Sequence, residues 1–103
     1  MYPAGLPKAE AAICTAMEDL AVLLQYACTL VKGDDLDSLN MTARQIEGLA
    51  ERIGMVKLSR VAVDVYLLCG RDDKPALHAT VSRMRRVGEQ SLIAIWDRED
   101  LSI

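Results

Sequence analysis

The residues with the clearest potential for chemistry lie in one short stretch, residues 42–54, which reads TARQIEGLAERIG. Glu47, Gly48 and Glu51 follow Arg44 at distances of three, four and seven residues, so a helix would place all four side by side and pointing outward. A glycine inside a helix costs roughly 1 kcal/mol relative to alanine. Gly48 therefore indicates either tight packing against a neighbouring helix or a place where a partner comes close.

The charged residues of this stretch limit what it can do. The guanidinium of Arg44 stays protonated at physiological pH and has no free lone pair, so it cannot act as a nucleophile. Arg44 and Glu47 are three residues apart, and we expect them to form a solvated ion pair worth a few tenths of a kcal/mol. The alternative is that Arg44 offers its positive charge to a partner.

An apolar stripe that begins at Leu36 and runs through this stretch predicts a helix. Its apolar residues recur at steps of three and four, the period of a helix that buries one side. Asp34 or Asp35 is a suitable cap before this helix, and Gly54 is a suitable stop after it. The expected core positions are Leu36, Leu39, Ala43, Ile46, Ala50 and Ile53.

A first helix is predicted from about Lys8 to Lys32, ended by Gly33. Its core stripe is Ile13, Met17, Leu20, Leu24, Ala27 and Val31. The opposite side is also apolar, which is typical of an interface, and it carries Val22, Leu23, Tyr26 and Leu30. Self-association through this helix, docking of a partner and cover by the N-terminal segment are the three alternatives.

Two further helices complete the chain. The third is expected from about Lys57 to Cys69, with Leu58, Val61, Ala62, Val65 and Leu68 inward. After a turn in which Asp73 is the expected cap and Pro75 is tolerated, the fourth runs to about Asp97. It buries Leu77, Val81, Met84, Ser91 and Ile95 around Gly88. Short links between four helices predict an all-α, up-down-up-down four-helix bundle that forms a single domain over residues 1–103, with loose ends at 1–6 and 98–103.

The order of residues resembles the histidine phosphotransfer (HPt) family, whose signature Ala-His-x-Leu-Lys-Gly is followed six residues later by Gly. The matching positions here are Ala43, Ile46, Gly48 and Gly54. The phosphorylated histidine of the family falls on Arg44, and its lysine falls on Glu47. The loops around residues 31–39, 55–58 and 69–72 also resemble those of the family, so the resemblance covers nearly the whole chain.

The resemblance implies a bacterial two-component module that has lost its phosphate chemistry. Such a module is not an enzyme and needs no cofactor or metal; it would bind a receiver domain or a histidine kinase in a phosphorelay without carrying phosphate. The acidic pocket of a receiver is the kind of site that Arg44 would enter. The partner-binding residues are then Arg44, Glu47, Gly48 and Glu51, together with Val22, Leu23, Tyr26 and Leu30 on the first helix.

Two alternatives stay open. One is a structural or oligomerising helical bundle, such as a homodimer through the first helix. The other is phosphotransfer through His78, the only histidine, although an ordinary surface histidine is the favoured interpretation. Arg83, Arg85 and Arg86 form a basic cluster without interleaved aromatics, which is more typical of a solvated face than of a phosphate site.

Composition adds broad limits. A net charge of −3 argues mildly against nucleic acid as the main partner. The sequence suggests no signal peptide and no apolar run long enough to span a bilayer, so we expect no membrane association and a cytoplasmic protein. Cys14, Cys28 and Cys69 are far apart and lack the spacing of a metal or redox motif, so all three are expected to be small buried hydrophobes.

Overall fold

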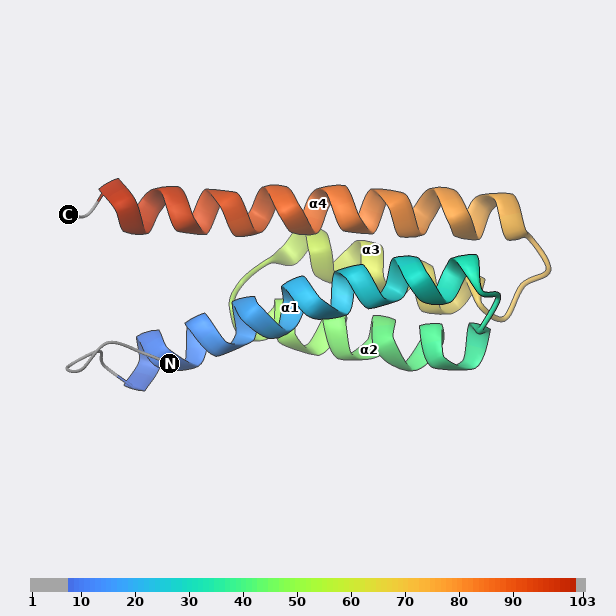
Figure 1. Ribbon diagram of the computed structural model, residues 1–103, viewed down its shortest axis with the longest axis horizontal. Coiled ribbons are helices and arrows are strands. Elements are labelled where there is room, and N and C mark those ends of the chain that lie inside the picture. The colour runs from blue at the N-terminus through green and yellow to red at the C-terminus, as the bar shows by residue number, and fades with distance from the viewer. Residues whose placement is uncertain (1–7, 102–103) are drawn as a thin grey trace.

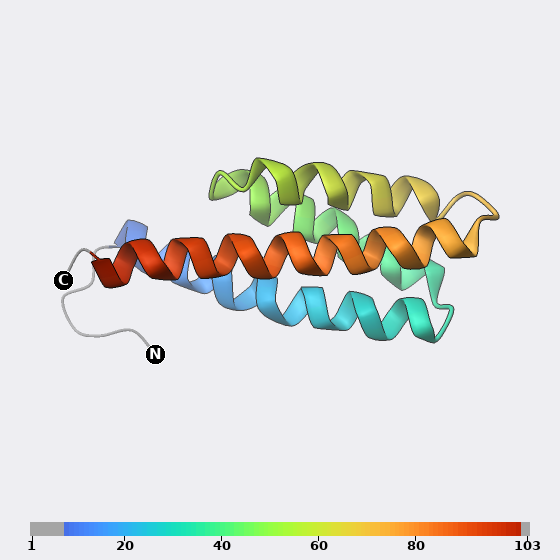
Figure 2. The same cartoon turned by 90° about the horizontal axis from the view of Figure 1, so that it is seen from above.

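A computed structural model describes the backbone of residues 8–101 and the side chains of residues 11–95. The described chain is helical without strands, and its elements are α1 (Lys8–Lys32), α2 (Leu36–Arg52), α3 (Val56–Leu68) and α4 (Lys74–Leu101). Each helix packs against its neighbours in a closed ring, so α2 and α4 are diagonally opposite (Figure 1, Figure 2). The predicted four-helix bundle is confirmed.

The core is aliphatic, and the predicted stripes account for most of it. Residues with no exposed surface come from all four helices and include Leu20, Leu39, Ile46, Leu58 and Met84. Several predicted core residues are only partly buried against this cluster: Leu36, Ile53, Leu68 and Ile95. Ser91 is likewise half-buried. The spacing of apolar residues therefore identified the correct side of every helix.

Two residues of α1 differ from prediction in their burial. Ile13 was predicted in the core but is 39% exposed, because it lies beside Ile53, where α2 has already ended. Leu30 was predicted on the outward apolar side but is buried at 7% exposure, since it lies next to the short turn that brings α2 against α1.

Asp34 and Asp35 form that turn, and each has a different structural role. Asp34 adopts φ 61°, the left-handed conformation that ends α1, and the Asp35 amide donates to the Leu30 carbonyl at 3.0 Å. The Asp35 carboxylate then caps α2 by accepting from the Ser38 amide at 3.2 Å. Helix α1 ends at Lys32, directly before Gly33 as predicted, although the left-handed conformation is adopted by Asp34 and not by Gly33. The predicted cap by Asp35 is confirmed.

The end of α2 and the start of α4 follow the same rules, whereas α3 has no side-chain cap at its start and no left-handed residue at its end. Gly54, at φ 79°, ends α2, and the Met55 amide donates to the Ala50 carbonyl at 2.8 Å. The Asp73 carboxylate caps α4 by accepting from the Ala76 amide at 3.1 Å. Helix α3 begins one residue before the predicted Lys57 and ends one before Cys69.

The fourth helix is longer than predicted. It continues past the predicted end at about Asp97 to Leu101, into residues that the sequence predicts to be a loose end. Residues 1–6, the other predicted loose end, lie outside the described residues, as do 102 and 103.

At the start of α4, Lys74 pairs with Asp34 at 2.9 Å, and this contact raises the pKa of the Lys74 ammonium.

Helix α1 also contains a long apolar run, Ala11–Lys32, of 22 residues. Its length and composition would suffice to cross a bilayer, so the expectation that no such run exists is wrong. The run also supplies core residues such as Leu20 and Ala27, and a core helix of a soluble bundle or an N-terminal signal sequence has the same composition. The run therefore does not decide where the protein resides, and the cytoplasm stays a prediction.

Gly88 lies where α4 packs against Leu24 of α1. It is buried, and a methyl group added to it would overlap the end of the Leu24 side chain, which is itself only 3% exposed. Because Leu24 is enclosed, it has little room to move aside.

We expect Gly88→Ala to lower the free energy of unfolding by about 1 kcal/mol. Overpacking a filled core costs about 1–3 kcal/mol, of which the better helix propensity of alanine returns about 1. In a Leu24→Ala background the same change should instead stabilise, because the truncated side chain leaves room for the methyl group. Urea unfolding followed by circular dichroism measures both; a stabilised single variant would contradict the close packing.

Candidate functional site

The outer face of α2, defined by Arg44, Glu47, Gly48 and Glu51, lies where the sequence predicts it. Arg44, Gly48 and Glu51 are exposed, and Glu47 is half-buried on the side toward α3. This orientation follows from the opposite side of the helix, where the buried stripe faces the core. The same face also exposes Met41, at 66%, which no pattern in the sequence marks as a site residue.

Arg44 is held in a defined position by residues of α2 and α3. Its Nε donates to the Oδ1 of Asn40, one turn earlier, at 2.8 Å. Its guanidinium lies over the ring of Tyr66 on α3, with the Cζ atom 4.3 Å from the ring centroid. Such a cation–π contact contributes roughly 0.5–1 kcal/mol at an exposed site. The contacts leave the terminal Nη donors of Arg44 without a partner among the described hydrogen bonds.

The two residues that hold Arg44 are themselves fixed. The Nδ2 of Asn40 donates to the backbone carbonyl of Tyr66 at 3.1 Å, which ties α2 to α3. The Tyr66 hydroxyl donates to the Oε2 of Glu47 at 3.4 Å, a long hydrogen bond. Arg44, Asn40, Tyr66 and Glu47 therefore form one connected group, which we call the Arg44 network.

The expected ion pair between Arg44 and Glu47 is wrong. Within residues 11–95 no ion pair joins them; each side chain turns instead to Tyr66, which offers a π face to the cation and a hydroxyl to the carboxylate. Spacing along α2 could not show this, because Tyr66 comes from another helix. An aromatic residue on the neighbouring helix was the signal available in the sequence.

Gly48 stands in open space. No atom lies within 4 Å of the place where a methyl group on Gly48 would be, so the alternative that this glycine serves internal packing is excluded. A partner can therefore approach the α2 backbone at this point without meeting a side chain.

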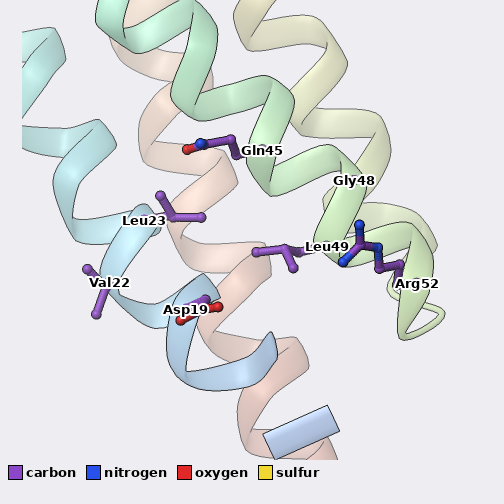
Figure 3. A pocket seen from close by; sticks show the side chains of 7 residues that line it. All are labelled: Asp19, Val22, Leu23, Gln45, Gly48, Leu49 and Arg52. Atoms are coloured by element: carbon purple, nitrogen blue, oxygen red, sulfur yellow. The ribbon is translucent and has the colours of Figure 1, made fainter. Parts of the chain in front are cut away.

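A groove lies beside Gly48, between α2 and α1 (Figure 3). It has a volume of about 520 Å³, and Leu23 and Leu49 project between the two helices. The other lining residues are Asp19, Val22, Gln45, Gly48 and Arg52. The groove thus joins the apolar side of α1 to the outer face of α2.

The predicted apolar surface of α1 is present in part. Val22 is 68% exposed and Tyr26 49%, whereas Leu23 is half-buried in the groove. Leu30, predicted as the fourth member, belongs to the core. The structure therefore brings Val22 and Leu23 together with Gly48, but it does not place Leu30 on this surface.

The remaining candidates for chemistry lie elsewhere. His78 is exposed near the start of α4, the helix diagonally opposite α2. Arg83, Arg85 and Arg86 are exposed, and Arg85 pairs with Glu89 at 3.0 Å, as expected of a solvated face. The part of the chain with described side chains holds no group of three or more residues suited to bind a metal ion.

The cysteines are free and half-buried, so the expectation of full burial is wrong for Cys14, Cys28 and Cys69. Cys28 and Cys69 pack against the core cluster. Burial raises the pKa of the Cys69 thiol, which lowers the fraction of reactive thiolate.

Comparisons with known proteins give no further guide to this site. No family model, no curated protein and no solved structure matches the chain.

We expect Gly48→Ala to raise the free energy of unfolding by about 0.5–1 kcal/mol. Alanine is the better helix former, and its methyl group meets nothing at this position. The effect is opposite in sign to that of Gly88→Ala, so the two variants serve as matched controls in one urea titration. A loss of stability in Gly48→Ala would contradict the open surroundings of this residue.

Proposed function

We propose that the chain is a catalytically silent, HPt-like module of two-component signalling. It binds a receiver domain or a histidine kinase through the outer face of α2 and carries no phosphate. The observation that supports this most directly is the Arg44 network, which presents a fixed guanidinium where the HPt family has its phosphorylated histidine.

The surroundings of Arg44 fit the tasks that the HPt resemblance gives them. Ala43 and Ile46, on the family motif, are fully buried and fix the rotation of α2. Gly48, one turn after Arg44, leaves the surface bare for a partner. Gly54 ends the helix in the left-handed conformation. These positions support an HPt-like frame that lacks its nucleophile.

The chemistry of the outer face favours binding over transfer. Phosphotransfer needs an imidazole nitrogen that attacks phosphorus and leaves again near neutral pH, and arginine offers none. A guanidinium instead presents a planar set of N–H donors that suits carboxylates. Because Asn40 engages Nε and Tyr66 supports the plane, the Nη donors remain for the acidic pocket of a receiver.

Preorganisation strengthens this proposal. A free arginine loses side-chain entropy when it is immobilised at an interface, about 0.5–1.5 kcal/mol for a long side chain. In the Arg44 network much of this ordering is already present before a partner arrives. Glu47 turns toward Tyr66, away from Gly48, and does not neutralise Arg44 directly.

A second candidate function is a structural or oligomerising bundle, which the exposed Val22 and Tyr26 favour. A structural or oligomerising role does not explain why the Arg44 network holds the guanidinium in a fixed position. Phosphotransfer through His78 is the third candidate, and nothing in the surroundings of this exposed residue favours it.

The binding test uses receiver domains and histidine kinases from the same organism, passed over the immobilised chain. We expect at least one of them to be retained, and Arg44→Glu to weaken that retention about tenfold or more, because the reversed charge repels an acidic pocket. Arg71→Glu, in the exposed loop between α3 and α4, is the matched control and should bind like the wild type. Equal loss in both variants would mean non-specific attraction, and no retention would contradict the proposal.

A gain-of-function test examines the HPt-like frame itself. The wild-type chain, mixed with phosphorylated receivers, is expected to take up no acid-labile phosphate. Arg44→His combined with Glu47→Lys restores the nucleophile and the nearby positive charge, so this double variant should become labelled. Label must survive His78→Ala in the double variant; label on the wild type that vanishes with His78→Ala would instead establish His78 as the phosphoacceptor.

A further inference from the structure

The bundle has one closed end and one open end. Helices α1 and α4 have 25 and 28 residues, whereas α2 and α3 have only 17 and 13. The additional residues of α1 and α4 lie at the end of the bundle that holds the start of α1 and the end of α4. There the two helices diverge beyond the α2–α3 turn (Figure 1). Beyond that turn the four-helix arrangement lacks two of its members.

The apolar stripes continue into this region. Ile13 lies seven residues before Leu20 on the same stripe of α1, yet Ile13 is 39% exposed and Leu20 is fully buried. On α4, Ile95 lies seven residues after the buried Gly88 and is only half-buried. The apolar stripes of α1 and α4 therefore extend beyond the part of the bundle that α2 and α3 cover.

Two cavities lie at the base of the open end, one on each side of the α2–α3 turn. The cavity toward α1 has a volume of about 520 Å³ and is lined by Ala12, Ile13, Ala16 and Ile53, among others. The cavity toward α4 has a volume of about 290 Å³ and is lined by Met55, Val56, Ala94 and Ile95. Ile53 lines both, so they form one surface across the tip of the bundle, in which aliphatic side chains lie beside Asp19, Arg52 and Lys57.

We propose that this open end is an interface, and that its occupant is the open end of a second copy of the chain. A two-fold related copy supplies the two helices that are missing beyond the α2–α3 turn, and it receives the same two in return. Each copy thereby covers the uncovered stripe of the other, which is the self-complementary contact that a two-fold dimer requires.

The charges at the open end suit a second copy. Its cavities are lined by Asp19 on α1 and by Arg52 and Lys57 beside the α2–α3 turn. Charges of both signs on one patch allow two-fold related copies to place opposite charges together, whereas a strongly acidic or basic partner would meet repulsion. The whole-chain charge of −3 is small enough for two copies to associate.

The proposed interface borders the groove beside Gly48 but does not include Arg44. The cavity toward α1 shares Asp19, Leu49 and Arg52 with that groove, whereas Arg44 and Gly48 line neither cavity of the open end. The two proposals are tested by different substitutions, Arg44→Glu for partner binding and Ile13→Glu for the dimer, so either can fail without the other.

Sedimentation equilibrium of the full chain tests the inference, at protein concentrations of about 1 to 100 μM. We expect a monomer–dimer equilibrium, in which Ile13→Glu raises the dissociation constant at least tenfold by placing a charge in the interface. Val22→Glu is the matched control, since it makes the same kind of change on the outer side of α1, at 68% exposure, and should leave the dimer intact.

Ala94→Glu tests the same interface from α4, because Ala94 is exposed and lines the cavity toward α4. Circular dichroism confirms that each variant is folded; if Ile13→Glu unfolds, Ala94→Glu alone carries the test. A wild-type chain that stays monomeric throughout would overturn the proposal. So would a dimer that Val22→Glu breaks, or one that both Ile13→Glu and Ala94→Glu leave unchanged.

Discussion

The burial of one stripe of α2 is the constraint on which the rest of the molecule depends. Leu39, Ala43, Ile46 and Ala50 have no exposed surface, and α2 packs against both α1 and α3. Successive residues of a helix are about 100° apart, so a shift of the stripe by one residue would turn Arg44 toward the core. Burying an unpaired guanidinium costs far more than any gain from a different packing. The apolar stripe therefore fixes the direction of Arg44 and the exposure of Gly48.

Two glycines in helices show why residue type alone does not reveal the reason for its presence. Gly88 is buried, and a side chain there would overlap Leu24, so it permits the close approach of α1 and α4. Gly48 meets nothing, and neither packing nor backbone geometry requires it. Relative to alanine, both glycines destabilise their helices by a similar amount, because glycine has a low helix propensity. Only the position of the neighbouring helix distinguishes them, which is why the sequence left two interpretations of Gly48 open.

Much of the fold could be predicted from the sequence because its determinants are local. Caps such as Asp35 and Asp73, and the stop at Gly54, act on the backbone within a few residues of themselves. Periodicity likewise identifies the buried side of each helix. Neither signal says how far the neighbouring helices extend. Ile13 is consequently exposed although it lies on the correct stripe, and the end of α4 was predicted too early.

The candidate site was predictable in its location but not in its contacts. The outward direction of Arg44 follows from the stripe of α2. Its engagement with Tyr66 depends instead on the pairing of α2 and α3, which brings residues 22 positions apart into contact. A local rule could offer only Glu47 as the partner of Arg44. Side chains that join two helices need the tertiary structure before they can be assigned.

The two proposed surfaces would work in different ways, and together they have a consequence that neither has alone. The outer face of α2 is polar and ordered, which gives specificity and fast association more than raw affinity. The open end adds aliphatic contact area, which is less selective than the polar outer face. A pair of chains joined at their open ends would display two Arg44 networks on one rigid body. A partner that is itself dimeric could then engage both, and the effective concentration of the second contact would raise its affinity without any new interaction. A weak contact at Arg44 would therefore suffice for retention of a dimeric receiver or kinase, while a monomeric receiver would still dissociate quickly.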